Sequence, residues 1–128
     1  RVIVAKAVAQ NPSLFLFDEP TSDLDLRNQI EVMKTIRGLV DNINEKKSAL
    51  VAVHDIDLAC RFADRILLLH EGKVKAFDTP ESVVNEQNIA EVFGVTCTIL
   101  SATDESPMRV LVGDEIKFNP ASIIKEEE

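Results

Sequence analysis

Glycine, proline and cysteine are scarce in this sequence of 128 residues, which contains 4, 5 and 2 of them respectively. Collagen-like chains need glycine at every third position, and small domains that depend on disulfides are rich in cysteine. Hydrophobic residues make up 45% of the chain, which is more than a disordered chain contains. The composition therefore excludes these three classes and indicates a globular domain with a hydrophobic core.

The sequence also lacks long hydrophobic runs and an excess of basic residues. No apolar run approaches the roughly 20 residues that a transmembrane helix requires, and no initial segment has the order of a secretory signal. We therefore expect a cytosolic location. Lys and Arg number 14 against 22 Asp and Glu, which gives a formal net charge of -8. Because such a chain repels a phosphate backbone, we expect no nucleic-acid partner.

Cys60 and Cys97 do not have the paired spacing of a zinc site or a redox motif, so we expect each to fill apolar space. The first residue is arginine, and residues 1–10 place hydrophobic side chains at helical spacing with no capping residue before them. We therefore expect this sequence to be a piece of a longer protein.

Short apolar runs and helical periodicities alternate along the first seventy residues. An apolar strand is typical of a parallel sheet that is covered on both faces. The order strand, helix, strand, helix, strand predicts an α/β layer fold with a mostly parallel sheet, in which ligands bind at the carboxyl ends of the strands. The predicted elements are a helix over 1–10, strands over 14–17, 49–53 and 66–69, and helices over 26–40 and 56–63.

Smaller elements are predicted around these. Asp25 is placed to cap the first long helix, and Arg27 and Glu31 to pair on its exposed side. The later elements are a strand over 74–77 that pairs with 66–69 after a turn, a helix from Pro80 capped by Thr79, a helix over 88–93 that Gly94 ends, a hairpin of 96–100 with 109–112, and an acidic tail over 125–128.

Charged side chains follow two of the predicted strands. Asp18 and Glu19 come directly after the strand over 14–17, and His54 follows the strand over 49–53. A carboxylate at a strand end can ligate Mg²⁺, and a second one can polarise a water for attack on phosphorus. Taken alone, the two acids can also be solvated or helix-capping residues, and His54 can be a hydrogen-bonded structural histidine.

The acidic stretch 18–25 also suggests a calcium loop, but its positions do not fit. Counting from Asp18 puts Pro20 at the third position, and counting from Asp23 puts Arg27 at the fifth with no glycine at the sixth. Calcium is therefore excluded.

Six short segments of this sequence, taken in the order in which they occur, together resemble the second half of an ATP-binding cassette (ABC) ATPase. The resemblance runs from residue 1 to about residue 94, and the ordered set is specific although each motif alone is weak. The segments that carry it are Gln10-Asn11-Pro12, the strand over 14–17, Asp18-Glu19-Pro20-Thr21-Ser22-Asp23-Leu24-Asp25, Val51-Ala52-Val53-His54-Asp55, Ala63-Asp64-Arg65-Ile66 and Glu71-Gly72-Lys73-Val74.

The resemblance implies roles for individual residues. Asp18, at the end of the Walker B strand, would hold Mg²⁺, and Glu19 would activate the attacking water. His54 would contact the γ-phosphate of ATP, and Ser22 and Asp25 would lie at the nucleotide in the D-loop. Phosphoryl transfer depends mainly on positioned charge and a positioned water, which suits these residue types.

The resemblance also implies a partial P-loop NTPase fold, with an ATPase core over 1–94 and an extension with a short hairpin over 95–128. It implies the ATP-hydrolysing subunit of an ABC transporter, working with a second ATPase subunit and membrane permease subunits on the cytoplasmic side of the membrane. The segment 23–37 and the tail after residue 94 are most similar to subunits that import iron chelates, haem or cobalamin. The alternatives are an ABC-type ATPase that acts on ribosomes or nucleic acid, and a non-catalytic interaction module.

Several motifs of the family are absent from this sequence. Its four glycines are too far apart to form a phosphate loop, and the family's glutamine loop and glycine-rich signature belong upstream of residue 1. In the D-loop, Asp23 stands where alanine is commonest. We expect the 128-residue chain alone to be inactive and to bind no ATP tightly, and its exposed sheet edge to make it a homo-oligomer.

Overall fold

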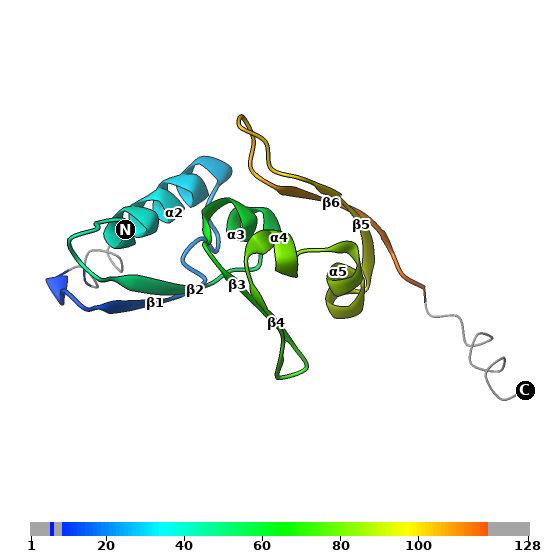
Figure 1. Cartoon of the computed structure of the whole chain (residues 1–128), viewed down its shortest axis with the longest axis horizontal. Coiled ribbons are helices and arrows are strands. Elements are labelled where there is room, and N and C mark those ends of the chain that lie inside the picture. The colour runs from blue at the N-terminus through cyan, green and yellow to red at the C-terminus, as the bar shows by residue number, and fades with distance from the viewer. Residues whose placement is uncertain (1–5, 7–8, 118–128) are drawn as a thin grey trace, which may run out of the picture. The chain divides into compact units, whose positions relative to one another are not determined.

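The computed structural model describes residue 6 and residues 9–117 (Figure 1). Most of the predicted helix over 1–10 and all of the tail over 125–128 lie outside the described residues. The chain divides into two compact units, residues 1–63 and 64–128. Helices and two-stranded sheets occur in both units, so the predicted α/β class is confirmed. The domain boundary at residue 94 stays a prediction.

The first unit is built on a pair of parallel strands. Strand β1 (Leu14–Asp18) and strand β2 (Ser48–Ala52) pair in parallel, with Phe15 opposite Ala49. Helix α2 (Leu26–Val40) connects the two strands, and helix α3 (Ile56–Phe62) follows β2. Each of these elements begins and ends within one residue of its predicted bounds.

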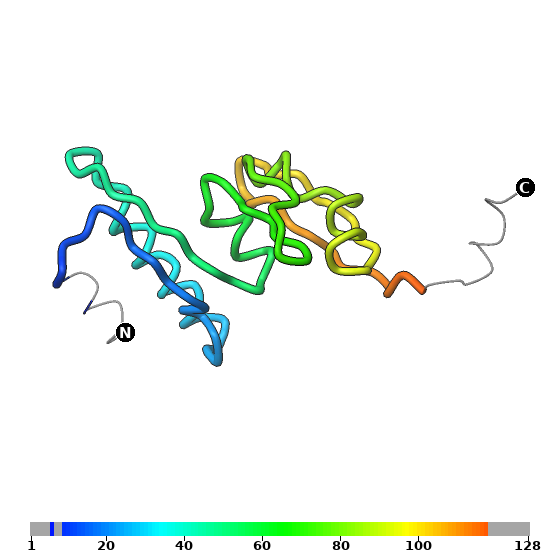
Figure 2. The backbone as a smooth tube through the Cα atoms, turned by 90° about the horizontal axis from the view of Figure 1, so that it is seen from below, coloured from blue at the N-terminus to red at the C-terminus, as the bar shows by residue number. Residues whose placement is uncertain are grey.

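The core of this unit lies between the strand pair and the helices. Phe15 and Phe17 of β1 pack with Met33 and Ile36 of α2 and with Leu58 of α3, and all five are buried. Figures 1 and 2 show α2 lying along β1 and β2. Burial of one such side chain contributes about 1.5–3 kcal/mol, so this core holds the strand ends in place.

The opposite face of the strand pair is exposed. Leu14, Leu16 and Leu50 are 53%, 69% and 57% exposed, because successive side chains of a strand point to opposite faces. The prediction that these strands are covered on both faces is therefore wrong for the described residues, whose helices cover one face only. Within the described part of the chain, parallel pairing is also limited to β1 and β2.

Polar contacts fix both ends of α2. The Asp25 carboxylate accepts a hydrogen bond from the backbone N–H of Asn28, in the first turn of α2, at 2.8 Å. Asp25 is therefore the N-cap of this helix, as predicted. Near the other end, Arg37 Nη1 donates to the carbonyl of Phe62 at 3.2 Å, which ties α2 to the end of α3. The predicted pair of Arg27 and Glu31 is formed at 3.3 Å.

The second unit contains two antiparallel hairpins and two short helices, and both hairpins were predicted. Helix α4 packs against the first hairpin, and α5 packs against β5. The turn of the first hairpin has positive φ at Glu71 and Gly72, as a two-residue type I′ turn requires. The elements are β3 (Ile66–His70), β4 (Lys73–Asp78), α4 (Pro80–Val83), α5 (Glu86–Phe93), β5 (Val95–Leu100) and β6 (Arg109–Glu115).

Two helix starts in this unit differ from the prediction. Thr79 occupies the N-cap position of α4, but its hydroxyl donates to Ser82 Oγ at 3.2 Å instead of capping the backbone. Helix α5 begins at Glu86, two residues earlier than predicted, because the Asn85 side chain caps it. Gly94 ends α5 with φ 67°, as predicted.

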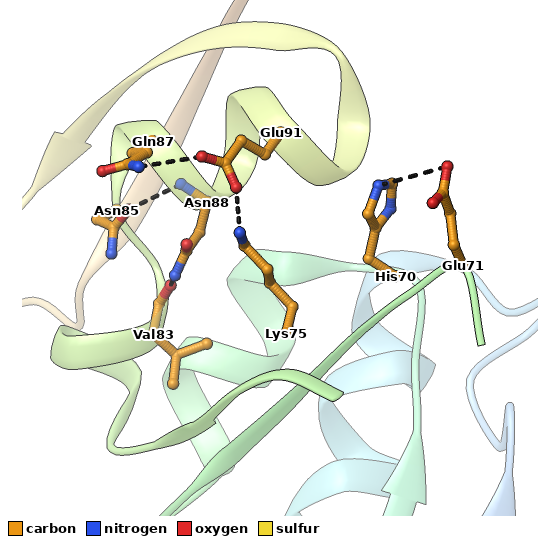
Figure 3. A network of polar contacts seen from close by, with 8 residues as sticks. All are labelled: His70, Glu71, Lys75, Val83, Asn85, Gln87, Asn88 and Glu91. Atoms are coloured by element: carbon orange, nitrogen blue, oxygen red, sulfur yellow. Dashed lines mark hydrogen bonds and ion pairs between the residues drawn. The ribbon is translucent and has the colours of Figure 1, made fainter. Parts of the chain in front are cut away.

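A polar network joins α5 to β4 (Figure 3). Lys75 of β4 forms an ion pair with Glu91 of α5, and Gln87 Nε2 donates to the same carboxylate at 3.0 Å. The Asn88 side chain donates to the carbonyl of Val83 at 2.7 Å. These contacts link α5 to both the hairpin and α4.

Cys60 is buried and Cys97 is half-buried, as expected for residues that fill apolar space. Burial raises the pKa of the Cys97 thiol. Among the described residues, no helix combines the length and the hydropathy that a membrane span needs.

Candidate functional site

The carboxyl ends of β1 and β2 bring Glu19 and His54 into contact. His54 Nε2 lies 2.5 Å from Glu19 Oε1. The parallel register places Asp18 opposite Ala52, so the residues that follow each strand emerge at the same edge. The N–H of Glu19 donates to the carbonyl of Ala52 at 2.9 Å, which extends the ladder by one bond. The sequence prediction that these strand ends share an edge is confirmed.

Glu19 has an unusual backbone conformation. Its φ is 49°, in the left-handed region that glutamate rarely adopts, at a cost of about 1–3 kcal/mol. The surrounding hydrogen bonds maintain this conformation, since the carbonyl of Glu19 also accepts the N–H of Ser22 at 3.1 Å. The positive φ turns the chain immediately after β1, at the start of the loop that leads to α2.

A cavity of about 140 Å³ opens beside the pair. It is smaller than the roughly 300–1,000 Å³ that encloses a drug-sized ligand. It therefore has room for a small group with water, but not for a whole nucleotide. The cavity is lined by Glu19, Thr21, Ser22, Asp23, Gln29, Val53, His54 and Asp55.

The predicted site residues are only partly brought together. Glu19, His54 and Ser22 line the cavity. Asp18 is exposed at the end of β1, immediately before Glu19, and does not line it. Asp25 also lies outside the lining, and its carboxylate caps α2.

Five of the eight residues that line the cavity had no predicted site role, namely Thr21, Asp23, Gln29, Val53 and Asp55. Gln29 reaches it from the first turn of α2, four residues after the cap Asp25. Asp55 caps α3 by accepting a backbone N–H at 3.1 Å. Thr21 is 8% exposed and anchors the connecting loop. The position of Gln29 in the first turn of α2 was a signal that could have found it. A helix that starts near a strand end places its first turn beside that end.

Mg²⁺ is the metal that the sequence analysis assigns to Asp18. Among the described residues, no group of three or more His, Cys, Asp and Glu side chains could hold a metal ion by itself. Mg²⁺ does not need such a group, since it is usually bound by one or two carboxylates together with phosphate and water oxygens. Asp18 offers one exposed carboxylate at the strand end. The residues present therefore fit Mg²⁺ when a phosphate accompanies it.

Comparison with known proteins gives related sequences. No protein-family model matches the chain. It is 40% identical over 99 residues to an uncharacterized ABC transporter ATP-binding protein of Methanocaldococcus jannaschii, covering 77% of this chain and 38% of that protein. It is 41% identical over 100 residues to the hemin import ATP-binding protein HmuV of Rhodopseudomonas palustris, covering 78% and 36%.

A third relative is the petrobactin import ATP-binding protein FpuD of Bacillus anthracis, which is 37% identical over 99 residues, covering 77% of this chain and 36% of FpuD. The chain therefore spans less than two fifths of the length of these curated relatives.

Solved structures give the same picture. A putative metal-chelate type ABC transporter in an inward-facing conformation matches with a TM-score of 0.72 and 25% identity, over 88% of this chain and 43% of that one. CbiO1 of Clostridium perfringens, part of the ABC transporter complex CbiONQ, matches with a TM-score of 0.57 and 27% identity, over 70% and 35%. Both similarities extend beyond a single motif.

Proposed function

Because this chain is homologous to the ATP-binding proteins of ABC transporters, we propose that it forms the C-terminal part of an ATP-hydrolysing transporter subunit. The observation that carries the proposal is the contact between Glu19 and His54 at the ends of two parallel strands, beside the small cavity. Hydrolysis of ATP requires an oriented water and stabilised charge on the γ-phosphate. A carboxylate and an imidazole at this position supply both.

In the proposed mechanism, Glu19 orients the attacking water and accepts its proton. Its strained backbone and its contact with His54 hold the carboxylate in one place before the reaction starts. When ATP is bound, the His54 imidazole, whose Nε2 contacts Glu19 in this structure, would turn from this carboxylate and donate to the γ-phosphate. Asp18 would hold Mg²⁺, which neutralises phosphate charge when bound. Ser22 adds a hydroxyl to the cavity, and Asp25 fixes the helix start beside it.

We further propose that the transporter imports an iron complex or a similar chelate. This rests on the relatives, which are named for the import of hemin and of petrobactin. The subunit would then work with a second ATPase subunit and with membrane permease subunits, on the cytoplasmic face of the membrane. An ATPase that acts on ribosomes or nucleic acid is disfavoured by the net charge of -8.

The proposal is tested by steady-state ATP hydrolysis of the full-length subunit, alone and with its permease. Magnesium-dependent hydrolysis that increases when the chelate is transported would support it, and absence of hydrolysis would contradict it.

The 128-residue chain is the matched comparison, because it lacks a phosphate loop. We expect calorimetric titration of this chain with Mg-ATP to give no tight binding. A dissociation constant in the low micromolar range would show that the remaining residues bind nucleotide without the phosphate loop.

A further inference from the structure

Gln29 occupies a position on α2 where the helix faces the core. It lies four residues before Met33 and seven before Ile36, and both of these are buried in the core of the first unit. Residues at this spacing share one face of a helix, and that face is normally apolar where it packs against a core. Gln29 therefore places a carboxamide at the end of an apolar stripe, in the first turn of the helix that Asp25 caps.

No structural partner explains the carboxamide at this position. The backbone N–H of Gln29 donates to the carbonyl of Asp25 at 2.9 Å, as the helix requires. The side chain is half-buried, and within the described part of the chain it makes no hydrogen bond. An unpaired polar group that is withdrawn from water destabilises a fold, whereas an apolar side chain of the same shape is neutral or stabilising there. Stability of the fold therefore does not account for glutamine at position 29.

Gln29 lines the cavity beside Glu19 and His54, and among the described residues that line it, Gln29 alone comes from α2. A carboxamide both accepts hydrogen bonds through its oxygen and donates them through its nitrogen. Water is the small molecule that uses both capacities. The cavity has room for it, since one water needs about 10–15 Å³ and the cavity measures about 140 Å³.

Helix α2 holds Gln29 in a fixed place relative to Glu19. Phe17 of β1 and Met33 of α2 are buried in the same core, and β1 ends immediately before Glu19. Fixed placement matters for a group that acts in catalysis, because a displacement of about 1 Å can cost about 100-fold in rate.

We propose that Gln29 is a catalytic residue whose carboxamide oxygen accepts a hydrogen bond from the water that Glu19 orients. The inference rests on the proposed function. In hydrolysis, the water oxygen bonds to the γ-phosphorus, one of its protons goes to Glu19, and the bond from the γ-phosphorus to the oxygen of ADP breaks. Gln29 accepts from the second hydrogen, which stays on the product phosphate, so the lone pair of the water faces the phosphorus. Gln29 is not the glutamine of the family's glutamine loop, which belongs upstream of residue 1.

Gln29→Met removes the carboxamide and keeps the length of the side chain, and the two residues have similar helix propensities. In thermal unfolding of the 128-residue chain, we expect this variant to unfold at the wild-type temperature or up to about 3 °C above it. Lys34→Met introduces the same side chain at an exposed position of α2 that does not line the cavity. It is the control and should change neither the unfolding temperature nor the activity.

The second measurement is steady-state ATP hydrolysis by the full-length subunit. We expect Gln29→Met to lower kcat by about tenfold or more. The KM for ATP should stay within about twofold of the wild type, because the lost contact is with water and not with the nucleotide. A merely structural role would not separate kcat from KM in this way while the unfolding temperature is kept.

Wild-type kcat in Gln29→Met would overturn the proposal. A raised KM with unchanged kcat would also overturn it, since Gln29 would then bind the nucleotide instead of the water. An unfolding temperature more than about 3 °C below the wild type would identify a structural carboxamide, with the same consequence. If the wild-type subunit hydrolyses no ATP, the proposed function fails and this inference fails with it. If the wild type and Gln29→Met hydrolyse ATP equally well, only the role of Gln29 is wrong.

Discussion

His54 Nε2 lies 2.5 Å from Glu19 Oε1, although 35 positions separate the two residues in the sequence. The side chains are 86% and 43% exposed, so burial does not force them together. The parallel register of β1 and β2 holds the two side chains together, because it brings both strand ends to one edge of the sheet. An exposed pair of this kind contributes at most about 1 kcal/mol to folding. Replacing either residue should therefore change the chemistry more than the stability.

Glu19→Gln should preserve nucleotide binding and abolish hydrolysis in the full-length subunit. The amide keeps the shape of the carboxylate but is a far poorer base, and loss of a general base typically costs about 10²- to 10⁴-fold in rate. Calorimetry gives the binding and steady-state kinetics give the turnover. Glu31→Gln, at an exposed carboxylate of α2 that pairs with Arg27, is the control and should hydrolyse ATP normally. Normal turnover in Glu19→Gln would remove Glu19 from the catalytic role.

His54→Ala should slow hydrolysis while the fold stays intact. The imidazole is mostly exposed, so its loss should move the unfolding temperature by no more than about 2 °C. Circular dichroism during heating measures this, in parallel with kinetics. His70→Ala in the second unit, beside Glu71 at 3.9 Å, should leave turnover unchanged. A large drop in the unfolding temperature of His54→Ala, with unchanged turnover, would identify His54 as a structural histidine.

Much of the fold follows from local sequence signals. The N-cap Asp25, the turn at Gly72 and the end of α5 at Gly94 are set by residues that favour one backbone conformation, and all three were predicted. In contrast, the sequence did not predict that one face of β1 and β2 is exposed. A run such as that of residues 14–17 is apolar on both faces, and which face is covered depends on elements that the strand itself does not encode.

The site was predictable to a similar extent. The meeting of Glu19 and His54 follows from the geometry of parallel strands. The presence of Gln29 and Asp55 in the cavity does not, because each has an ordinary helical or capping role in the sequence. The left-handed backbone conformation of Glu19 could not be predicted from the sequence either, because glutamate has no preference for that conformation.

Two glycine-to-alanine substitutions should change the stability in opposite directions. In α2, a Cβ at Gly38 meets no atom within 4 Å, so Gly38→Ala should stabilise the chain by about 0.5–1 kcal/mol. In β6, a Cβ at Gly113 would lie 2.4 Å from Thr96 Oγ1, which accepts the N–H of Asp114 at 3.0 Å. Gly113→Ala should therefore destabilise it by about 1–3 kcal/mol. Urea unfolding measures both, and equal effects would contradict the packing argument.

Acid should remove the contribution of Glu91 to stability. Its side-chain hydrogen bond with Lys75, and then that with Gln87, lower the pKa of this carboxyl below 4.5 (Figure 3). A lowered pKa in the folded state stabilises the fold above pH 4.5, and this effect is lost as the pH falls through the folded-state pKa. Glu91→Gln should thus be less stable than the wild type at neutral pH and should approach it at low pH. Glu105→Gln, in an exposed loop, should not show this pattern in unfolding curves across the same pH range.

The 128-residue chain should associate with itself through the uncovered face of β1 and β2. Leu14, Leu16 and Leu50 lie on that face and are more than half exposed, and within the described residues each strand has one unpaired edge. Exposed apolar strands with open edges favour pairing with another chain. Light scattering should therefore give a mass above the monomer value of 14.2 kDa, with and without ATP.

Leu16→Lys combined with Leu50→Glu places opposite charges on neighbouring strand positions and should return the chain to a monomer with unchanged helix content. Ile43→Lys, at a side chain that is 95% exposed in the loop before β2, should leave the mass unchanged. A monomeric wild type would show that this face tolerates water, and the edge argument would then be wrong.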